Sequence, residues 1–245
     1  MKYYKILILK FLLFVANFST AQTFDFLPKS TTSQIIKHKY LTISYSEEYK
    51  QAEWVTYMLT SQRLNGIIKR EDKFTTDPLI YSNTASPNDY KKSGYDRGHL
   101  APAADMKFNE IAMKECFYMS NISPQLPGFN RGIWKKLEDQ VRQWAIEDDT
   151  LYIVTAGILT HINKKIGINR VGVPNTFYKI ILKYTSKEKK AIAFLIPNQK
   201  SDESIFYYAT TIDVIEKLTG IDFFPKLPDI IEIELESQIN INLWK

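Results

Sequence analysis

The chain has 245 residues, of which 44% are hydrophobic and 24% are charged. This composition suits a packed globule and excludes a disordered protein. The formal net charge is +5, but residues 1–21 contain Lys2, Lys5 and Lys10 and no acidic residue. The rest of the chain is therefore only weakly basic, and its charge alone does not indicate binding to nucleic acid.

Residues 1–21 have the pattern of a secretory signal peptide. A short basic start precedes an apolar run over residues 6–16, and small residues then predict cleavage near Ala21. A membrane anchor is the alternative, but Lys10 interrupts the run, which is shorter than the roughly 20 apolar residues that span a bilayer. We therefore expect a secreted or periplasmic protein that has no membrane partner after signal removal.

The single cysteine, Cys116, has no partner for a disulfide within the chain. Its apolar and aromatic neighbours predict a buried structural thiol rather than a nucleophile. No repeat or Pro/Gly/Ser-rich linker follows Gln22. Residues 22–245 are therefore expected to form one domain, and no pattern in them predicts an oligomeric state.

The first half of the chain is expected to supply strands and loops. Alternation of apolar and polar residues predicts strands over 40–45 and 53–59, and residues 69–89, with Pro78 and Pro87, predict a long surface loop. A short strand over 117–120 is expected to lead into the segment 121–125.

The second half has a stronger helical and strand pattern. An apolar stripe predicts a helix over 131–147, and three β-type runs predict central strands over 151–156, 177–184 and 191–196. A second helix is expected over 204–218, closed by Gly220, followed by a charged edge strand over 230–235. The expected fold class is α+β, with a mixed, mainly antiparallel sheet and helices packed on it.

The run Asp96-Arg97-Gly98-His99 carries the strongest chemical signal. An arginine matches the geometry of a phosphate, and a neutral histidine can take a proton from water near pH 7. Together they suggest phosphodiester hydrolysis. The other two histidines lack such neighbours: His38 lies between lysines and is expected to be solvated, and His161 is expected in a polar turn.

The helix predicted over 131–147 carries a second group of polar residues. At about 100° per residue, four positions fall within about 120° of one another: Asn130, Trp134, Glu138 and Arg142. An amide oxygen and a carboxylate suit Mg²⁺ that keeps most of its waters. The alternative is that Glu138 and Arg142 form a surface ion pair, which would stabilise the helix by only roughly a few tenths of a kcal/mol.

These residues, in this order and spacing, resemble the DNA/RNA non-specific endonucleases with a ββα-metal active site. The resemblance rests on three groups and runs over about residues 40–228: Asp96-Arg97-Gly98-His99, then Asn121 with Pro124-Gln125, then Asn130 with Trp134 and Leu137-Glu138. It implies a Mg²⁺-dependent enzyme, with Mn²⁺ as an alternative metal, that cuts DNA and RNA with little sequence preference and leaves 5′-phosphate ends.

The resemblance also implies roles for individual residues. His99 would be the general base that activates water, and Asn130 would be the direct protein ligand of one Mg²⁺. Glu138 would hold the metal through water, and Asn121 would orient the site. Arg97 and Arg142 would clamp the phosphate.

Two other functions stay open. A phosphodiesterase acting on small nucleotides would use the same residues. An inactive nucleic-acid-binding module would be expected to lack His99, Asn130 or Arg97, and all three are present.

Overall fold

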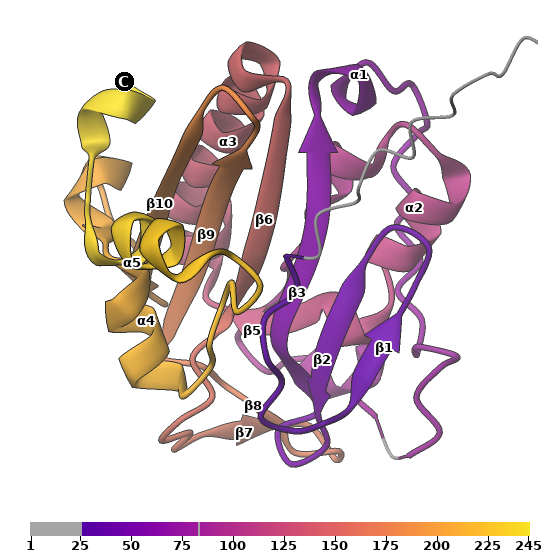
Figure 1. The fold of residues 1–245 in the computed structure, drawn as a ribbon. Helices are drawn as coiled ribbons and strands as arrows, with labels where there is room; N and C mark the ends of the chain where they lie inside the picture. The colour runs from indigo at the N-terminus through magenta and orange to yellow at the C-terminus, as the bar shows by residue number, and fades with distance from the viewer. Residues whose placement is uncertain (1–25, 83) are drawn as a thin grey trace, which may run out of the picture.

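A seven-stranded antiparallel sheet forms the centre of the molecule, in the order β1-β2-β3-β6-β9-β10-β11 (Figure 1). The structure is a computed structural model and describes residues 26–82 and 84–245; the predicted signal peptide, residues 1–21, lies outside the described residues. The strands are β1 (Ile35–Lys37), β2 (Thr42–Ser46), β3 (Gln51–Thr60), β6 (Thr150–Gly157), β9 (Thr176–Tyr184), β10 (Lys189–Pro197) and β11 (Ala209–Thr210).

Both faces of this sheet are covered by helices (Figure 1). The long helix α3 (Lys135–Asp148) lies on one face, and α4 (Ile212–Thr219) and α5 (Asp229–Ser237) lie on the other. Coverage on both sides explains why the central strands read as nearly continuous apolar runs. The predicted α+β class with a mainly antiparallel sheet is therefore confirmed.

A short antiparallel hairpin stands outside the large sheet. It pairs β4 (Asp96–His99) with β5 (Ile122–Gln125), so that Arg97 lies opposite Pro124 and His99 lies opposite Ile122. The chain then passes through a wide helical turn, η4 (Phe129–Trp134), directly into α3. Hairpin and helix together form the ββα arrangement that the sequence predicted.

The remaining elements are short. They are α1 (Ser61–Leu64), α2 (Glu110–Cys116), the pair β7 (Lys165–Ile166) and β8 (Val171–Gly172), and the helical turns η1 (Pro87–Tyr90), η2 (Ala103–Met106), η3 (Met119–Asn121), η5 (Ile205–Tyr208) and η6 (Ile241–Trp244). No helix among the described residues has the length and apolar character needed to cross a bilayer.

Three predicted elements were wrong. Residues 230–235 form part of helix α5 instead of an edge strand, because Pro228 accepts the first helical hydrogen bonds, from Ile231 and Glu232, and acidic residues favour a helix N-terminus. The helix expected over 204–218 is interrupted: β11 joins the sheet edge, and α4 begins only after its N-cap, Thr211. Residues 117–120 form no strand. Phe117 caps the C-terminus of α2, Met119–Asn121 form the helical turn η3, and the strand starts at Ile122.

Two single-residue predictions had opposite outcomes. Cys116 is fully buried, donates its thiol to the Met113 carbonyl at 3.0 Å, and has a pKa raised by burial, as expected for a structural cysteine. His38 is not solvated: its side chain is 4% exposed and its Nε2 lies 2.8 Å from Asp77 Oδ2. The flanking lysines therefore gave no guide to where the imidazole points.

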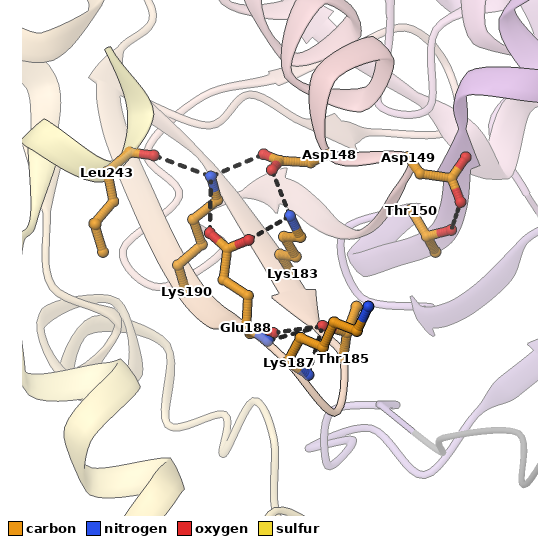
Figure 2. A network of polar contacts seen from close by, with 9 residues as sticks. All are labelled: Asp148, Asp149, Thr150, Lys183, Thr185, Lys187, Glu188, Lys190 and Leu243. Carbon is orange, nitrogen blue, oxygen red and sulfur yellow. Dashed lines mark hydrogen bonds and ion pairs between the residues drawn. The ribbon is translucent and has the colours of Figure 1, made fainter.

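A network of ion pairs fixes the end of α3 to the β9–β10 hairpin (Figure 2). Asp148 contacts Lys183 at 2.6 Å and Lys190 at 3.0 Å, and Glu188 also contacts both lysines. Lys190 in turn donates to the carbonyl of Leu243 at 3.0 Å, which holds the C-terminal segment. The side chains of Asp148 and Lys190 are each only 9% exposed, so little water screens this pair.

Asp148→Asn should lower the free energy of unfolding by about 2–3 kcal/mol. It leaves two largely buried lysines with Glu188 as their remaining acidic partner, and the loss is smaller than the about 3–5 kcal/mol for a wholly stranded buried charge. Urea denaturation measures the effect. Asp202→Asn, which breaks an exposed pair with Lys200, should change stability by less than about 0.5 kcal/mol. Equal effects of the two substitutions would show that the buried ion pairs of Asp148 do not stabilise the fold.

Candidate active site

A cavity of about 290 Å³ lies where the β4–β5 hairpin meets the start of α3. His99 and Asn130 line it, and its charged lining residues are Arg70, Arg97, Arg131, Lys135, Arg142 and a single carboxylate, Glu138. A second cavity of about 350 Å³ adjoins it and shares Arg97, Asn130 and Arg131. A cavity of similar volume, about 310 Å³, lies near Glu53 but is lined by no lysine or arginine. The excess of positive charge, rather than size, distinguishes the first site and suits an anionic ligand.

His99 is held in an aromatic wall of the cavity. Its ring packs edge-on against Phe117 at 4.7 Å and lies 5.4 Å from Phe74, measured between ring centroids. The residue is 9% exposed, and its Nε2 makes no hydrogen bond within the described part of the chain. Burial, followed by the charge of Arg70, lowers the pKa of His99 to about 3. The free imidazole is therefore neutral at pH 7, with one ring nitrogen unprotonated.

The glycine of the Asp-Arg-Gly-His run lies against a buried side chain. A Cβ on Gly98 would lie 2.1 Å from the side-chain oxygen of Gln125. Gln125 is fully buried on β5, so its side chain would have to move before a larger residue could occupy position 98. Glycine therefore lets the two strands that present Arg97 and His99 pair without displacing Gln125.

Asp96 connects the hairpin to the helical turn that follows. Its carboxylate accepts a hydrogen bond from Asn130 Nδ2 at 2.9 Å and two from the guanidinium of Arg131 at 2.8 and 2.6 Å. Because the amide nitrogen of Asn130 is committed to Asp96, the amide oxygen is left as a free acceptor among the described residues. A carbonyl oxygen held in this way is a suitable ligand for a hard cation.

Arg142 and Glu138 reach the same cavity from α3. Arg142 donates to the buried Asp105 at 2.9 Å and also to Asp139, so its guanidinium is fixed rather than free. Burial raises the pKa of the Glu138 carboxyl well above its ordinary value, against the opposing charge of Lys179. Glu138 and Arg142 therefore do not form the exposed surface pair that the sequence left open.

Arg97 and Asn121 differ in their access to the cavity. Arg97 donates to the carbonyl of Pro87 at 3.0 Å, lies over the Phe74 ring, and has a buried Nε that finds no partner among the described residues. Asn121 is fully buried and does not line the cavity. Its side chain exchanges hydrogen bonds with the backbone of Ala101 and donates to the carbonyl of Cys116, so it holds the segment that follows His99.

The structure changes one argument made from the sequence. A regular helix does not run from Asn130 to Arg142, because the chain kinks at Gly132 (φ −106°, ψ −112°) and the regular α3 begins at Lys135. Trp134 is fully buried in the core instead of sharing a face with the polar residues. Asn130, Glu138 and Arg142 nevertheless meet in one cavity.

Sequence reasoning missed three residues at the site. Arg70 lines the cavity from the long loop, where it is one of several charged residues in a row, so no signal singled it out. Lys179 lies in the middle of β9, 1% exposed, with its ammonium 4.9 Å from the Trp134 ring and a pKa lowered by burial. Asp105 is buried beneath Arg142 and also accepts a hydrogen bond from Tyr57.

A ββα unit that places a histidine and an asparagine around a cationic cavity defines a class of nuclease, and comparison with known proteins agrees. The family model of the DNA/RNA non-specific endonucleases matches residues 20–230. The chain belongs to this family.

Individual relatives are similar over most of the chain. The mitochondrial nuclease EXOG of Danio rerio is 35% identical over 202 residues, which are 76% of this chain and 59% of that protein. Nuclease C1 of Cunninghamella echinulata var. echinulata is 33% identical over 80% of this chain and 85% of that protein, and the mitochondrial endonuclease G of Homo sapiens is 31% identical over 80% and 71%. The chain thus spans about three fifths of the length of the EXOG relative.

A solved structure shares the fold. The crystal structure of an EndoG/EndoGI complex, described as showing the mechanism of EndoG inhibition, superposes with a TM-score of 0.74 at 29% identity. The match covers 80% of this chain and 87% of that one.

The buried neutral His99 predicts a pH-dependent stability. Its folded-state pKa of about 3 lies below the unfolded value of about 6.5. Between pH 6.5 and pH 3 the unfolded chain therefore binds more protons than the folded protein. The free energy of unfolding consequently falls as the pH drops below 6.5. Between pH 7 and pH 5, wild type should lose about 2 kcal/mol more than His99→Gln in urea denaturation. Parallel losses in the two proteins would show that His99 titrates normally.

Proposed function

We propose that this protein is a secreted, Mg²⁺-dependent endonuclease that hydrolyses the phosphodiester bonds of DNA and RNA and leaves 5′-phosphate ends, with Mn²⁺ as an alternative metal. The observation that carries the proposal is one cavity that holds a neutral histidine, an amide oxygen without a partner, and five cationic side chains against one carboxylate. Secretion rests on the signal-peptide pattern of residues 1–21.

The residues present fit a divalent cation. Asn130 offers a carbonyl oxygen whose orientation Asp96 fixes, and Glu138 offers a carboxylate in the same cavity. Asn130 would hold the ion directly and Glu138 would hold it through water, which suits Mg²⁺ because this ion keeps much of its hydration shell. When bound, the ion would stabilise the negative charge that develops on the phosphate and the leaving oxygen.

The protein groups supply the remaining chemistry. His99 accepts the proton of the attacking water, since its imidazole is neutral at pH 7. Arg97 and Arg142 bind the non-bridging phosphate oxygens, and each is fixed in place by a second contact, to Pro87 and to Asp105 respectively. Asn121 stays outside the reaction and positions His99 by holding the backbone that follows it.

The same geometry accounts for weak sequence preference. His99, Arg97, Arg142, Asn130 and Glu138 would contact water, phosphate or metal, and such contacts carry no base information. Tyr90 and Tyr95 line the adjoining cavity, but Tyr90 is only 4% exposed, so it offers little surface for stacking on a base. The substrate is therefore read through its backbone, which DNA and RNA share.

His99→Ala should lower cleavage of both plasmid DNA and RNA by about 10²- to 10⁴-fold, because it removes the general base. The assay compares residues 22–245 with Mg²⁺ and with EDTA. His161→Ala is the matched control, since His161 is exposed and lies outside the cavity. Full activity of His99→Ala, or cleavage that persists in EDTA, would refute the mechanism.

The same assay separates the two alternative functions. Binding of both polymers without cleavage by wild type would favour the inactive nucleic-acid-binding module. Cleavage of small phosphodiesters alone would favour the nucleotide phosphodiesterase.

Asp96→Asn should raise the Mg²⁺ concentration needed for half-maximal activity by about 10- to 100-fold. The carboxylate is a positioning group for Asn130, and loss of such a group typically weakens metal binding or activity by this factor. A Mg²⁺ titration of the cleavage rate, with Asp202→Asn as the surface control, measures the change. An unaltered Mg²⁺ dependence would show that Asp96 does not act through Asn130.

A further inference from the structure

A second group of carboxylates lies on the opposite face of the sheet from α3. Asp213 and Glu216 are on α4 and Glu236 is on α5, the two helices that pack together in front of β9 and β10 (Figure 1). One carboxylate oxygen from each residue lies within 4.8 Å of the other two. Asp213 is exposed, Glu216 is half-buried and Glu236 is buried, so the group opens to solvent on one side.

Helix α5 buries a carboxylate more deeply than any of its apolar side chains. Glu236 is its only buried residue, at 6% exposure, whereas Ile230 and Ile233 on the same helix are 83% and 66% exposed. The Oε1 atom of Glu236 is buried and has no hydrogen-bond partner in the described part of the chain. A buried carboxylate is normally paired, hydrogen-bonded or bound to a metal.

The charges around Glu236 make its burial still less favourable. After burial, the groups that raise the pKa of Glu236, to about 8, are all carboxylates: Glu216, Glu232, Asp213 and Asp222. Lys29 approaches the region, but it forms an ion pair with Asp222 at 2.6 Å and is 67% exposed. Glu216 uses one oxygen to accept the backbone N–H of Phe223 at 2.9 Å, which leaves its other oxygen available.

We propose that Asp213, Glu216 and Glu236 bind one Ca²⁺ ion. Oxygen ligands at about 2.3–2.6 Å from a common Ca²⁺ lie no more than about 5 Å apart, and the three carboxylates satisfy this limit. Mg²⁺ demands near-octahedral contacts at about 2.0–2.1 Å and usually keeps several waters beside one or two carboxylates, so a group of three carboxylates suits Ca²⁺ better. The ion would connect α5 to α4 and neutralise the buried Glu236.

This site is separate from the nuclease cavity. None of its three residues lines that cavity, and the sheet lies between them and α3. Its role would therefore be to stabilise the C-terminal helices. The proposed Ca²⁺ site does not depend on the proposed nuclease reaction.

Isothermal titration of the whole protein with CaCl₂ tests the proposal. Asn130→Ala removes the proposed catalytic ligand, so one Ca²⁺ site should remain in this variant. Glu236→Gln, made in the same background, should weaken Ca²⁺ binding at least tenfold and abolish the rise in melting temperature that Ca²⁺ causes. Glu234→Gln, an exposed residue on the same helix, should leave both unchanged. DNA cleavage with Mg²⁺ should be unaffected when Glu236→Gln is made alone in the wild-type chain, where Asn130 is intact.

Other results would contradict the proposed Ca²⁺ site. Absence of Ca²⁺ binding to Asn130→Ala, or equal affinity of the Glu236→Gln and Glu234→Gln variants, would overturn the site, and Glu236 would then be a neutral buried carboxyl. Binding of Mg²⁺ as tightly as Ca²⁺ would overturn the choice of ion. Asp213→Asn at the exposed edge provides a second test if Glu236→Gln does not fold, and it too should weaken Ca²⁺ binding at least tenfold.

Discussion

The hydrogen bonds of Asp96 are the constraint on which the candidate active site depends. They join the β4–β5 hairpin to the turn that begins the long helix, and in doing so they fix both Asn130 and Arg131. Since His99 lies three residues after Asp96 on the same strand, one carboxylate ties the proposed general base to the proposed metal ligand. The close approach of Gln125 to Gly98 fixes the register of that strand.

Burial then sets the charge state of each group. Removal from water favours the neutral form, so it lowers the pKa of His99 and raises that of Glu138. Lys179 beneath the helix opposes the rise at Glu138, and Asp105 keeps Arg142 charged and oriented. The cavity thereby combines a neutral base with fixed positive charge, the combination that an attack on a phosphodiester requires.

The sequence predicted which residues line the cavity better than it predicted their arrangement. Asp96-Arg97-Gly98-His99 and Asn130 could be identified because short motifs carry their own spacing, and the apolar β-runs predicted the central strands. Three features depend on tertiary packing and leave no local sequence pattern. They are the kink at Gly132, the ion pair of Arg142 with Asp105, and the position of Arg70, which lines the cavity from a loop distant in the sequence. The strand predicted over 230–235 was wrong for a different, local reason: alternating isoleucine and glutamate suits a strand, but Pro228 and the acidic residues after it start a helix.

Buried polar atoms without partners occur on both faces of the sheet, and they have the same physical meaning in each place. His99 Nε2 and Arg97 Nε lie on the side of α3, and Glu236 Oε1 lies on the side of α4 and α5. Folding removes such atoms from water at a cost that a hydrogen bond or a bound ion must offset. On the first face the compensating partner would be the substrate and its solvent, which come and go during turnover. On the second face the described residues place no sequence motif or cationic cavity beside the carboxylates, so the proposed Ca²⁺ would account for the burial of Glu236 without requiring a second reaction.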